Sequence, residues 1–190
     1  MTADEVAARA IRYKPYYGDK GGITLSGGEP LMQPDFAAEI FRLCRESGVH
    51  TALDTAGSRP DEAVKKVLEY TDLVLLDIKH CDPVKFKDIT GRDIEGTLEF
   101  LEYITAKGMN FWARQVIVPG INDNLPDIDL LADMLKNRPT LGRVELLPYH
   151  TLGVDKWKQL GISYRLENVP ALDQQTINRL NERLTAKMRG

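Results

Sequence analysis

Apolar residues along the chain alternate between short continuous runs and longer stretches in which they recur every three or four positions. Short runs are typical of buried strands, and the longer spacing is typical of helices with one buried face. The predicted strands cover residues 21–25, 50–53, 73–76, 111–118 and 144–147. The predicted helices cover residues 1–14, the stretch from Pro34 to Gly48, the stretch that opens at Pro60, the one that ends at Gly108, the one around Leu131 and the C-terminus around Leu180.

This order of elements predicts an α/β fold. Strands separated by helices pair in parallel through right-handed crossovers. The chain holds about five such βα repeats in 190 residues, whereas a complete eight-unit barrel needs about 250 residues. We therefore expect one domain over residues 1–190, built either as an open doubly wound sheet or as a partial (β/α) barrel with a parallel sheet.

Composition and charge exclude several classes of protein. With 25 basic and 28 acidic residues the net charge is 25 − 28 = −3, which gives no electrostatic reason to expect a nucleic-acid or membrane partner. No apolar run approaches the roughly 20 residues that cross a bilayer, and the N-terminus shows no signal peptide. The two cysteines exclude a disulfide scaffold and favour a reducing compartment, so we expect a cytoplasmic protein.

The cysteines also limit the metal chemistry of this chain. Cys44 is expected on the apolar face of a helix with Phe36, Ile40 and Leu43, where it serves as core. Cys81 follows a histidine in a loop, and a structural role is favoured over a metal-binding pair. Two thiols supply neither a four-cysteine zinc site nor the three thiolates of a site-differentiated iron–sulfur cluster.

Polar side chains gather where the predicted strands end, and this edge is where parallel α/β proteins bind ligands. The residues concerned are Ser26 to Glu29, Asp54, Thr55, Asp77, Lys79, Arg114 and His150. Alternation along the strand puts Leu75, Asp77 and Lys79 on one side. A buried acid and base are costly unless they are paired or bound to a ligand. The pattern therefore predicts one binding pocket at this edge.

Each of these residues, taken alone, also has an ordinary structural interpretation. The alternatives are a tight turn at Gly27 and Gly28, a solvated Glu29, a cap at Asp54 and Thr55, an ion pair of Asp77 with Lys79, an outward-pointing Arg114 and a satisfied loop histidine at His150. Five unrelated strand ends would all have to be polar by coincidence, so the pocket is the favoured hypothesis.

Several ordered segments resemble a known family. They are Ser26–Pro30 with its Gly-Gly-Glu sequence, Leu53–Gly57, Leu75–Lys79, Trp112–Gly120 and Glu145–His150, followed by Leu152-Gly153 and Lys156-Trp157. The chain resembles the radical S-adenosylmethionine superfamily and, within it, the glycyl-radical-enzyme activases that act on pyruvate formate-lyase. The resemblance covers nearly the whole chain, and the Leu-Pro-Tyr-His sequence is its most specific part. It implies a six-unit (β/α) partial barrel that lacks its first unit here.

The resemblance assigns the methionine half of S-adenosylmethionine to two segments. Gly27 and Gly28 would let the backbone approach the cofactor, because glycine has no Cβ in the way. Glu29 would hold its ammonium group. Asp77 and Lys79 would flank the amino-acid and ribose portions.

The resemblance also assigns the rest of the cofactor site. Ile78 would offer a backbone contact. Val118 and Pro119 would give adenine an apolar edge, and His150 would form a hydrogen bond with the adenosyl group.

A monovalent cation and a catalytic residue follow from the same resemblance. Asp54, Thr55, Asp77 and the carbonyl oxygen of Leu75 match positions that hold the cation beside the cofactor, and an all-oxygen set suits a hard ion. Arg114 matches a position near the cofactor and the incoming glycine loop of the partner, and is the candidate catalytic residue.

In the family, a 4Fe-4S cluster donates an electron to S-adenosylmethionine. Homolysis gives methionine and a 5′-deoxyadenosyl radical, which removes hydrogen from one glycine of a partner enzyme. The implied partners are a glycyl radical enzyme such as pyruvate formate-lyase and a reductant such as flavodoxin. The parent protein is expected to be a monomer.

The chain departs from the family in three respects. It has no Cys-x3-Cys-x2-Cys sequence for the cluster, so we expect an N-terminally truncated chain that is inactive alone. Ala56 stands where the family usually has asparagine, and Pro30 stands where some activases have alanine. The alternatives are a non-catalytic chain that binds S-adenosylmethionine or a partner, an activase of another glycyl radical enzyme, and a cation-dependent lyase using Asp54, Asp77 and Lys79.

Overall fold

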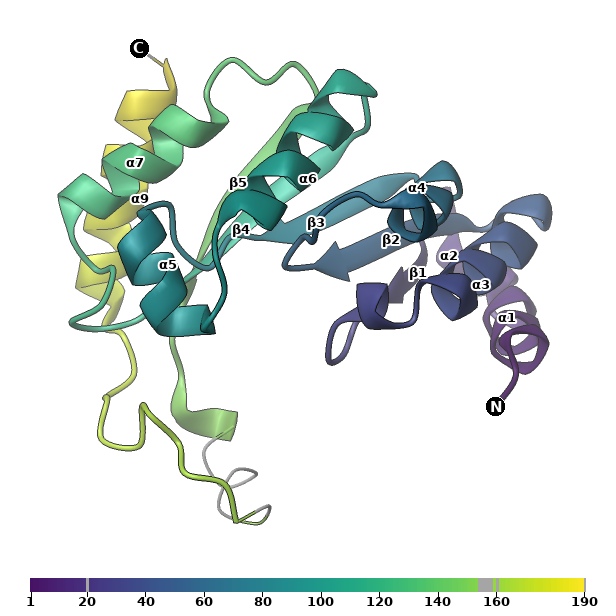
Figure 1. Cartoon of the computed structure of the whole chain (residues 1–190), viewed down its shortest axis with the longest axis horizontal. Helices are drawn as coiled ribbons and strands as arrows, with labels where there is room; N and C mark the ends of the chain where they lie inside the picture. The colour runs from purple at the N-terminus through teal and green to yellow at the C-terminus, as the bar shows by residue number, and fades with distance from the viewer. Residues whose placement is uncertain (20, 154–158, 160, 190) are drawn as a thin grey trace. The chain divides into compact units, whose positions relative to one another are not determined.

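The computed structural model describes residues 1–19, 21–153, 159 and 161–189 (Figure 1). They form two compact units, each of which is described by itself. Unit 1 comprises Met1–Ile78, Asp93–Ala113 and Arg138–Val144. Unit 2 comprises Lys79–Arg92, Arg114–Asn137 and Glu145–Gly190.

Within the described residues, five strands form one sheet, in the order β1-β2-β3-β4-β5. Their bounds are β1 Gly22–Leu25, β2 His50–Thr55, β3 Leu73–Asp77, β4 Phe111–Ile117 and β5 Leu141–Pro148. The printed registers of β1 with β2 and of β2 with β3 are parallel. The α/β class with a parallel sheet, predicted from alternating strands and helices, is confirmed.

Two helices precede β1, and at least one helix follows each strand along the chain. Those of unit 1 are α1 Ala3–Arg12, α2 Lys14–Tyr17, the 3-10 helix η1 Pro30–Met32, α3 Pro34–Glu46, α4 Glu62–Glu69 and α6 Glu95–Ala106. Those of unit 2 are α5 Pro83–Thr90, α7 Leu125–Leu135, the 3-10 helix η2 Thr151–Gly153 and α9 Gln174–Arg189. None of the described helices combines the length and the apolar character that a membrane span requires.

The structure corrects the predicted start of one helix and the end of one strand. Helix α4 begins at Glu62 rather than at Pro60, because the Asp61 side chain caps it by accepting a hydrogen bond from Val64 N at 2.9 Å. Strand β2 continues to Thr55 instead of ending at Leu53, because its last two residues pair with β3.

Two further expectations need correction. Helix α5 has no counterpart among the predicted helices, although Asp82 caps its first turn and Pro83 opens it. Phe36 shares a helix face with Ile40 and Cys44 but is 38% exposed in the first turn of α3, so it is not part of the core. The buried side of α3 also includes Phe41, because in a helix residue 41 lies next to residues 37 and 44.

The core of unit 1 is formed by side chains from both sheet and helices. Leu53, Val74, Leu76, Phe41, Cys44, Val67, Phe100 and Leu101 are among its fully buried members. Cys44 is completely buried, and burial raises the pKa of its thiol. The interpretation of Cys44 as a core residue agrees with this placement.

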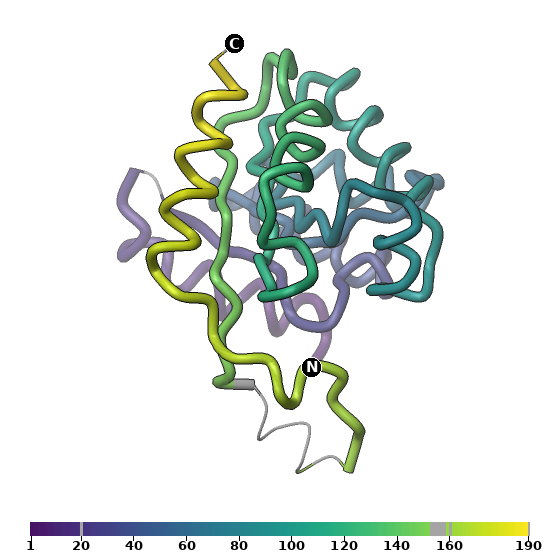
Figure 2. The backbone as a smooth tube through the Cα atoms, turned by 90° about the vertical axis from the view of Figure 1, so that its left-hand side faces the viewer, coloured from purple at the N-terminus to yellow at the C-terminus, as the bar shows by residue number. Residues whose placement is uncertain are grey.

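In unit 2, helix α9 packs along helix α7, as the tube view also shows (Figure 2). Ile128 and Leu131 of α7 and Leu180 of α9 are completely buried. Asp127 at the start of α7 lies in this core with its side chain only 6% exposed. It accepts hydrogen bonds from Lys85 Nζ at 2.6 Å and from Asn124 Nδ2 at 2.7 Å.

This ion pair makes the stability of the protein dependent on pH. Burial of the Asp127 carboxyl group opposes its ionisation, but the hydrogen bonds from Lys85 and Asn124, together with the nearby charges, lower its pKa overall. A carboxyl group whose pKa is lower in the folded state stabilises the protein above its unfolded pKa. That contribution is lost as pH falls through the folded pKa.

We predict that Asp127→Asn lowers the free energy of unfolding by about 2 kcal/mol near neutral pH. The difference from the unaltered protein should shrink as pH falls below about 4, the ordinary pKa of aspartate. Urea denaturation over a pH series measures it. Asp133→Asn, which breaks an exposed pair with Lys136, is the control and should change stability far less. A difference for Asp127→Asn that does not vary with pH would contradict this account.

Candidate functional site

The glycine loop after β1 has a conformation that only glycine adopts readily. Gly27 has φ +88° and Gly28 has φ +53°, both in the left-handed region. A Cβ added at either position would meet no atom within 4 Å. Glycine is therefore required here by backbone conformation, and both residues leave their backbone exposed to a ligand.

Glu29 connects this loop to the end of β2. Its Oε1 accepts hydrogen bonds from Leu31 N at 3.1 Å and from Thr55 Oγ1 at 2.7 Å. Its Oε2 accepts one from Ala56 N at 2.9 Å. At Ala56 the contact comes from the backbone, so it does not depend on the side chain at this position. Three of about four lone-pair directions of the carboxylate are thus occupied, and one remains for a ligand.

The residues expected to hold a cation lie at the ends of β2 and β3. Asp54 is the register partner of Leu75, and Asp77 lies two positions further on the same face of β3. The Thr55 hydroxyl donates to Glu29 and accepts from Gly57 N at 3.0 Å. A contact of Thr55 with a cation would therefore use its carbonyl oxygen or its last free lone pair.

No group of three or more His, Cys, Asp or Glu side chains suited to a metal occurs in the described part of the chain. Ile78, directly after Asp77, is completely buried. Its side chain belongs to the core, so only its backbone is available to a ligand.

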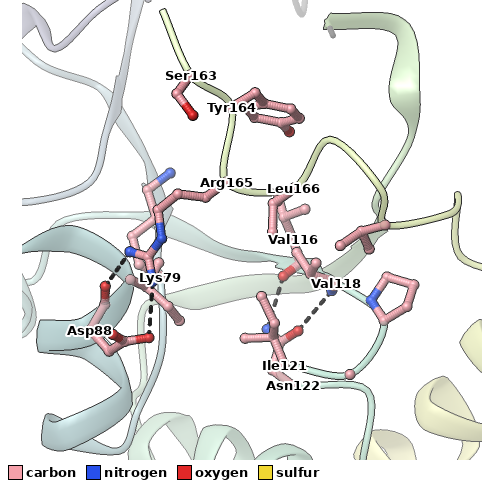
Figure 3. A pocket seen from close by; sticks show the side chains of 14 residues that line it. Lys79, Asp88, Val116, Val118, Ile121, Asn122, Ser163, Tyr164, Arg165 and Leu166 are labelled. Carbon is pink, nitrogen blue, oxygen red and sulfur yellow. Dashed lines mark hydrogen bonds and ion pairs between the residues drawn. The ribbon is translucent and has the colours of Figure 1, made fainter.

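Unit 2 contains a pocket of about 640 Å³ that brings three of the expected residues together. Lys79, Val118 and Pro119 line it, along with Val116. Segment 163–166 lines the pocket too, and Figure 3 shows it opposite Ile121 and Asn122. About half of the lining residues are aliphatic, which suits a flat apolar group, and Lys79 and Arg165 are its two cations.

His150 lies at a second pocket of about 420 Å³ in the same unit. Val116 lines both pockets. Arg114 precedes Val116 by two positions in β4, so the two side chains lie on the same face of that strand. His150 itself is exposed. Lys156 and Trp157 fall outside the described residues.

Segment 163–166 is the part of the pocket that sequence reasoning missed. The Arg165 guanidinium donates to the backbone oxygen of Asp88 at 2.6 Å and to its Oδ2 at 3.2 Å. Tyr164 OH lies 3.1 Å from Tyr149 OH, and desolvation, followed by this hydrogen bond, raises the pKa of Tyr164 to about 12. The segment has no hydrophobic period, so only its tertiary contacts reveal it.

Cys81 and the preceding histidine have structural roles. His80 is 1% exposed, and its Nδ1 accepts a hydrogen bond from Asp82 N at 2.9 Å. The Cys81 Sγ lies 3.8 Å from Met134 Sδ. Burial, with the nearby Asp127 charge, raises the pKa of the Cys81 thiol to about 12, so the thiolate that a metal requires is disfavoured.

Residues 1–134 match the sequence pattern of the Radical SAM superfamily. The match includes the glycine loop, the acidic ends of β2 and β3, and Lys79. The chain is therefore a radical S-adenosylmethionine protein. It is 43% identical over 185 residues to pyruvate formate-lyase-activating enzyme of Clostridium pasteurianum, with 97% of this chain and 77% of that protein covered. It is 38% identical to the Listeria monocytogenes protein of the same name, with 95% and 76% covered. The chain belongs to the family of pyruvate formate-lyase-activating enzymes.

Solved structures agree with this assignment. A domain of pyruvate-formate lyase-activating enzyme from Bacteroides vulgatus is similar with a TM-score of 0.72 and 26% identity, covering 88% of this chain and 94% of that one. Streptococcus suis SuiB bound to S-adenosylmethionine has a TM-score of 0.75 at 18% identity, covering all of this chain and 41% of that one. The second likeness concerns the fold alone.

We predict that Thr55→Val lowers the free energy of unfolding by about 1–2 kcal/mol, because Glu29 loses a donor and Gly57 N loses its acceptor. Amide hydrogen exchange at Gly57 should become faster. Thr71→Val is the matched control, since the Thr71 hydroxyl is also buried and bonds to Val67 O in its own turn. It should leave exchange at Gly57 unchanged. If the Gly57 amide exchanged at the same rate in both variants, the Thr55 hydroxyl would not hold the backbone at Gly57.

Proposed function

We propose that this chain supplies the S-adenosylmethionine-binding part of a pyruvate formate-lyase-activating enzyme. The observation that carries the proposal is the glycine loop held to β2 by Glu29, with its backbone open at Gly27 and Gly28. The family to which the chain belongs supports the choice of cofactor. In this proposal, residues of this chain bind the cofactor and orient it for radical chemistry.

The methionine end would bind at the loop of Gly27 and Gly28. The backbone at Gly27 and Gly28 would approach the amino-acid group, and the remaining acceptor position of Glu29 would receive its ammonium. Because three donors already fix the Glu29 carboxylate, it would not need to reorganise on binding. Asp77 and the backbone of Ile78 would contact the same portion of the cofactor.

The adenosyl end would bind at the pocket lined by Lys79, Val118 and Pro119. The aliphatic pocket edge at Val118 and Pro119 suits the flat face of adenine, and Lys79 would contact the ribose and carboxylate portions. His150, at the neighbouring pocket, would form a hydrogen bond with the adenosyl group. Bound S-adenosylmethionine would supply the adenosyl group on which radical chemistry depends.

We also propose a monovalent cation at the ends of β2 and β3. Asp54 and Asp77 would contribute carboxylates, and Leu75 and Thr55 would contribute backbone oxygens. A hard ion prefers such oxygen ligands. The ion would offset the negative charge of two carboxylates on one face.

The residues of this chain do not fit a 4Fe-4S cluster. Cys44 is completely buried in α3 of unit 1, and the thiolate of Cys81 in unit 2 is disfavoured. We therefore derive no step through a cluster. In the family setting, the protein would act in the cytoplasm on a glycyl radical enzyme such as pyruvate formate-lyase. A reductant such as flavodoxin would supply electrons. Arg114 would contact the partner's loop that carries the reacting glycine.

The cysteine placement leads to a direct prediction. Anaerobic incubation with iron and sulfide should leave the purified chain with no stoichiometric iron, because two cysteines cannot supply the three thiolates that hold a site-differentiated cluster. Iron and sulfide analysis measures this. The Cys44→Ser, Cys81→Ser double variant should give the same values. A full complement of iron that disappears in the double variant would contradict the prediction.

Binding of S-adenosylmethionine, followed by NMR titration, tests the proposed function. Glu29→Gln and Lys79→Gln should each raise the dissociation constant about tenfold, since each removes a charged contact with the cofactor. Glu46→Gln and Lys136→Gln are matched controls, because they remove exposed charges on α3 and after α7. They should leave the constant unchanged. Failure of the unaltered chain to bind, or equal constants in all four variants, would overturn the proposal.

A further inference from the structure

The side chain of Asn122 is buried against the last residues of β4. It is 1% exposed. Its Oδ1 accepts a hydrogen bond from Val118 N at 2.7 Å, and its Nδ2 donates one to Val116 O at 2.9 Å. Figure 3 shows both bonds below the pocket. A single carboxamide therefore bonds to one backbone group at the end of β4, Val116 O, and to one directly after it, Val118 N.

These two backbone groups lie on one edge of β4. On the opposite edge, Ile117 O accepts a hydrogen bond from Tyr149 N at 2.9 Å. Successive residues of a strand direct their backbone groups to alternate edges, so the groups of Val116 and Val118 point away from Tyr149. Asn122 supplies there the donor and acceptor that a neighbouring strand would otherwise provide.

The turn that carries Asn122 is closed by further hydrogen bonds. Val118 O accepts from Ile121 N at 3.1 Å and from Asn122 N at 3.3 Å. Asp123 Oδ1 accepts from Gly120 N at 2.9 Å. Pro119 has no N–H to satisfy. Every backbone N–H from Val118 to Asn122 thus has an acceptor, and the edge of the pocket is held in one conformation.

We propose that Asn122 is a positioning residue for the nucleoside edge of the pocket. This inference rests on the proposed function, which places adenine against Val118 and Pro119. Asn122 acts through the backbone of β4, because its carboxamide takes the place of a strand and fixes where the two apolar side chains stand.

The chemistry of the position requires a neutral amide. Leucine has a similar size but offers neither donor nor acceptor, so Val116 O and Val118 N would be left without a partner. An ionised aspartate would accept from Val118 N but could not donate to Val116 O. Asn122→Leu therefore removes both hydrogen bonds, whereas Asn122→Asp removes only the one to Val116 O.

The test combines ligand binding with hydrogen exchange in the unaltered chain, Asn122→Leu, Asn122→Asp and the control Asn181→Leu. Asn181 donates to Ile177 O on the exposed side of α9, so its substitution removes an amide hydrogen bond within the same unit. The ligands are S-adenosylmethionine and 5′-deoxyadenosine, which carries only the adenosyl part. Dissociation constants are taken from NMR titrations of folded protein.

Asn122→Leu should raise both dissociation constants about tenfold and Asn122→Asp less, while Asn181→Leu should change neither. The Val118 amide should exchange faster in Asn122→Leu, and the Leu131 amide in the core of α7 should not. Exchange that rises equally at both amides would indicate general destabilisation and overturn the inference. Unchanged affinity for 5′-deoxyadenosine in Asn122→Leu would also overturn it.

Failure of the proposed function gives a different result. If the unaltered chain binds neither ligand, the assignment of the cofactor is wrong, and the positioning role falls with it. That outcome is visible before any variant is compared.

Discussion

One carboxylate, that of Glu29, fixes the part of the molecule on which the functional assignment depends. The loop before it contains two glycines with positive φ, a conformation with little intrinsic preference for a single geometry. Three hydrogen bonds to Glu29 remove that freedom by joining the loop to Thr55, Ala56 and η1. Without this connection, the exposed glycine backbone would not be held ready for a ligand.

The same physical device recurs in unit 2. Polar side chains bond to backbone groups at the points where strands end, because these groups have no strand partner there. Asn122 does this at the end of β4, where its carboxamide bonds to Val118 N and Val116 O. A backbone hydrogen bond from Leu172 N to Tyr149 O adds to it after β5. Tyr149 also places its hydroxyl beside Tyr164. The irregular segments that line the pocket thus owe their positions to a few specific hydrogen bonds.

Much of the fold could be predicted from the sequence, because buried strands are short apolar runs. Leu73 to Leu76 is such a run, and β3 forms there. Helix α5 was not predicted, because its Val84 is exposed and Phe86 is its one buried residue, which gives only a weak hydrophobic period. The exposed Phe36 shows that an apolar residue near the expected face need not be buried.

The sequence predicted only part of the candidate site. The ordered motifs identified Glu29, Lys79 and Val118, and the structure places the last two at one pocket. The sequence did not indicate that the Thr55 hydroxyl bonds to Glu29, since hydroxyl direction depends on neighbours from another strand. Nor did it indicate segment 163–166, whose position depends on contacts with Asp88 and Tyr149 that are far away along the chain.

A crystal structure of the chain with S-adenosylmethionine would test the central claim most directly. The account predicts the ammonium and carboxylate of the cofactor at the backbone of Gly27 and Gly28 beside Glu29, and adenine against Val118 and Pro119. Electron density for the cofactor elsewhere on the protein, with no ligand at the glycine loop or at Val118 and Pro119, would contradict it.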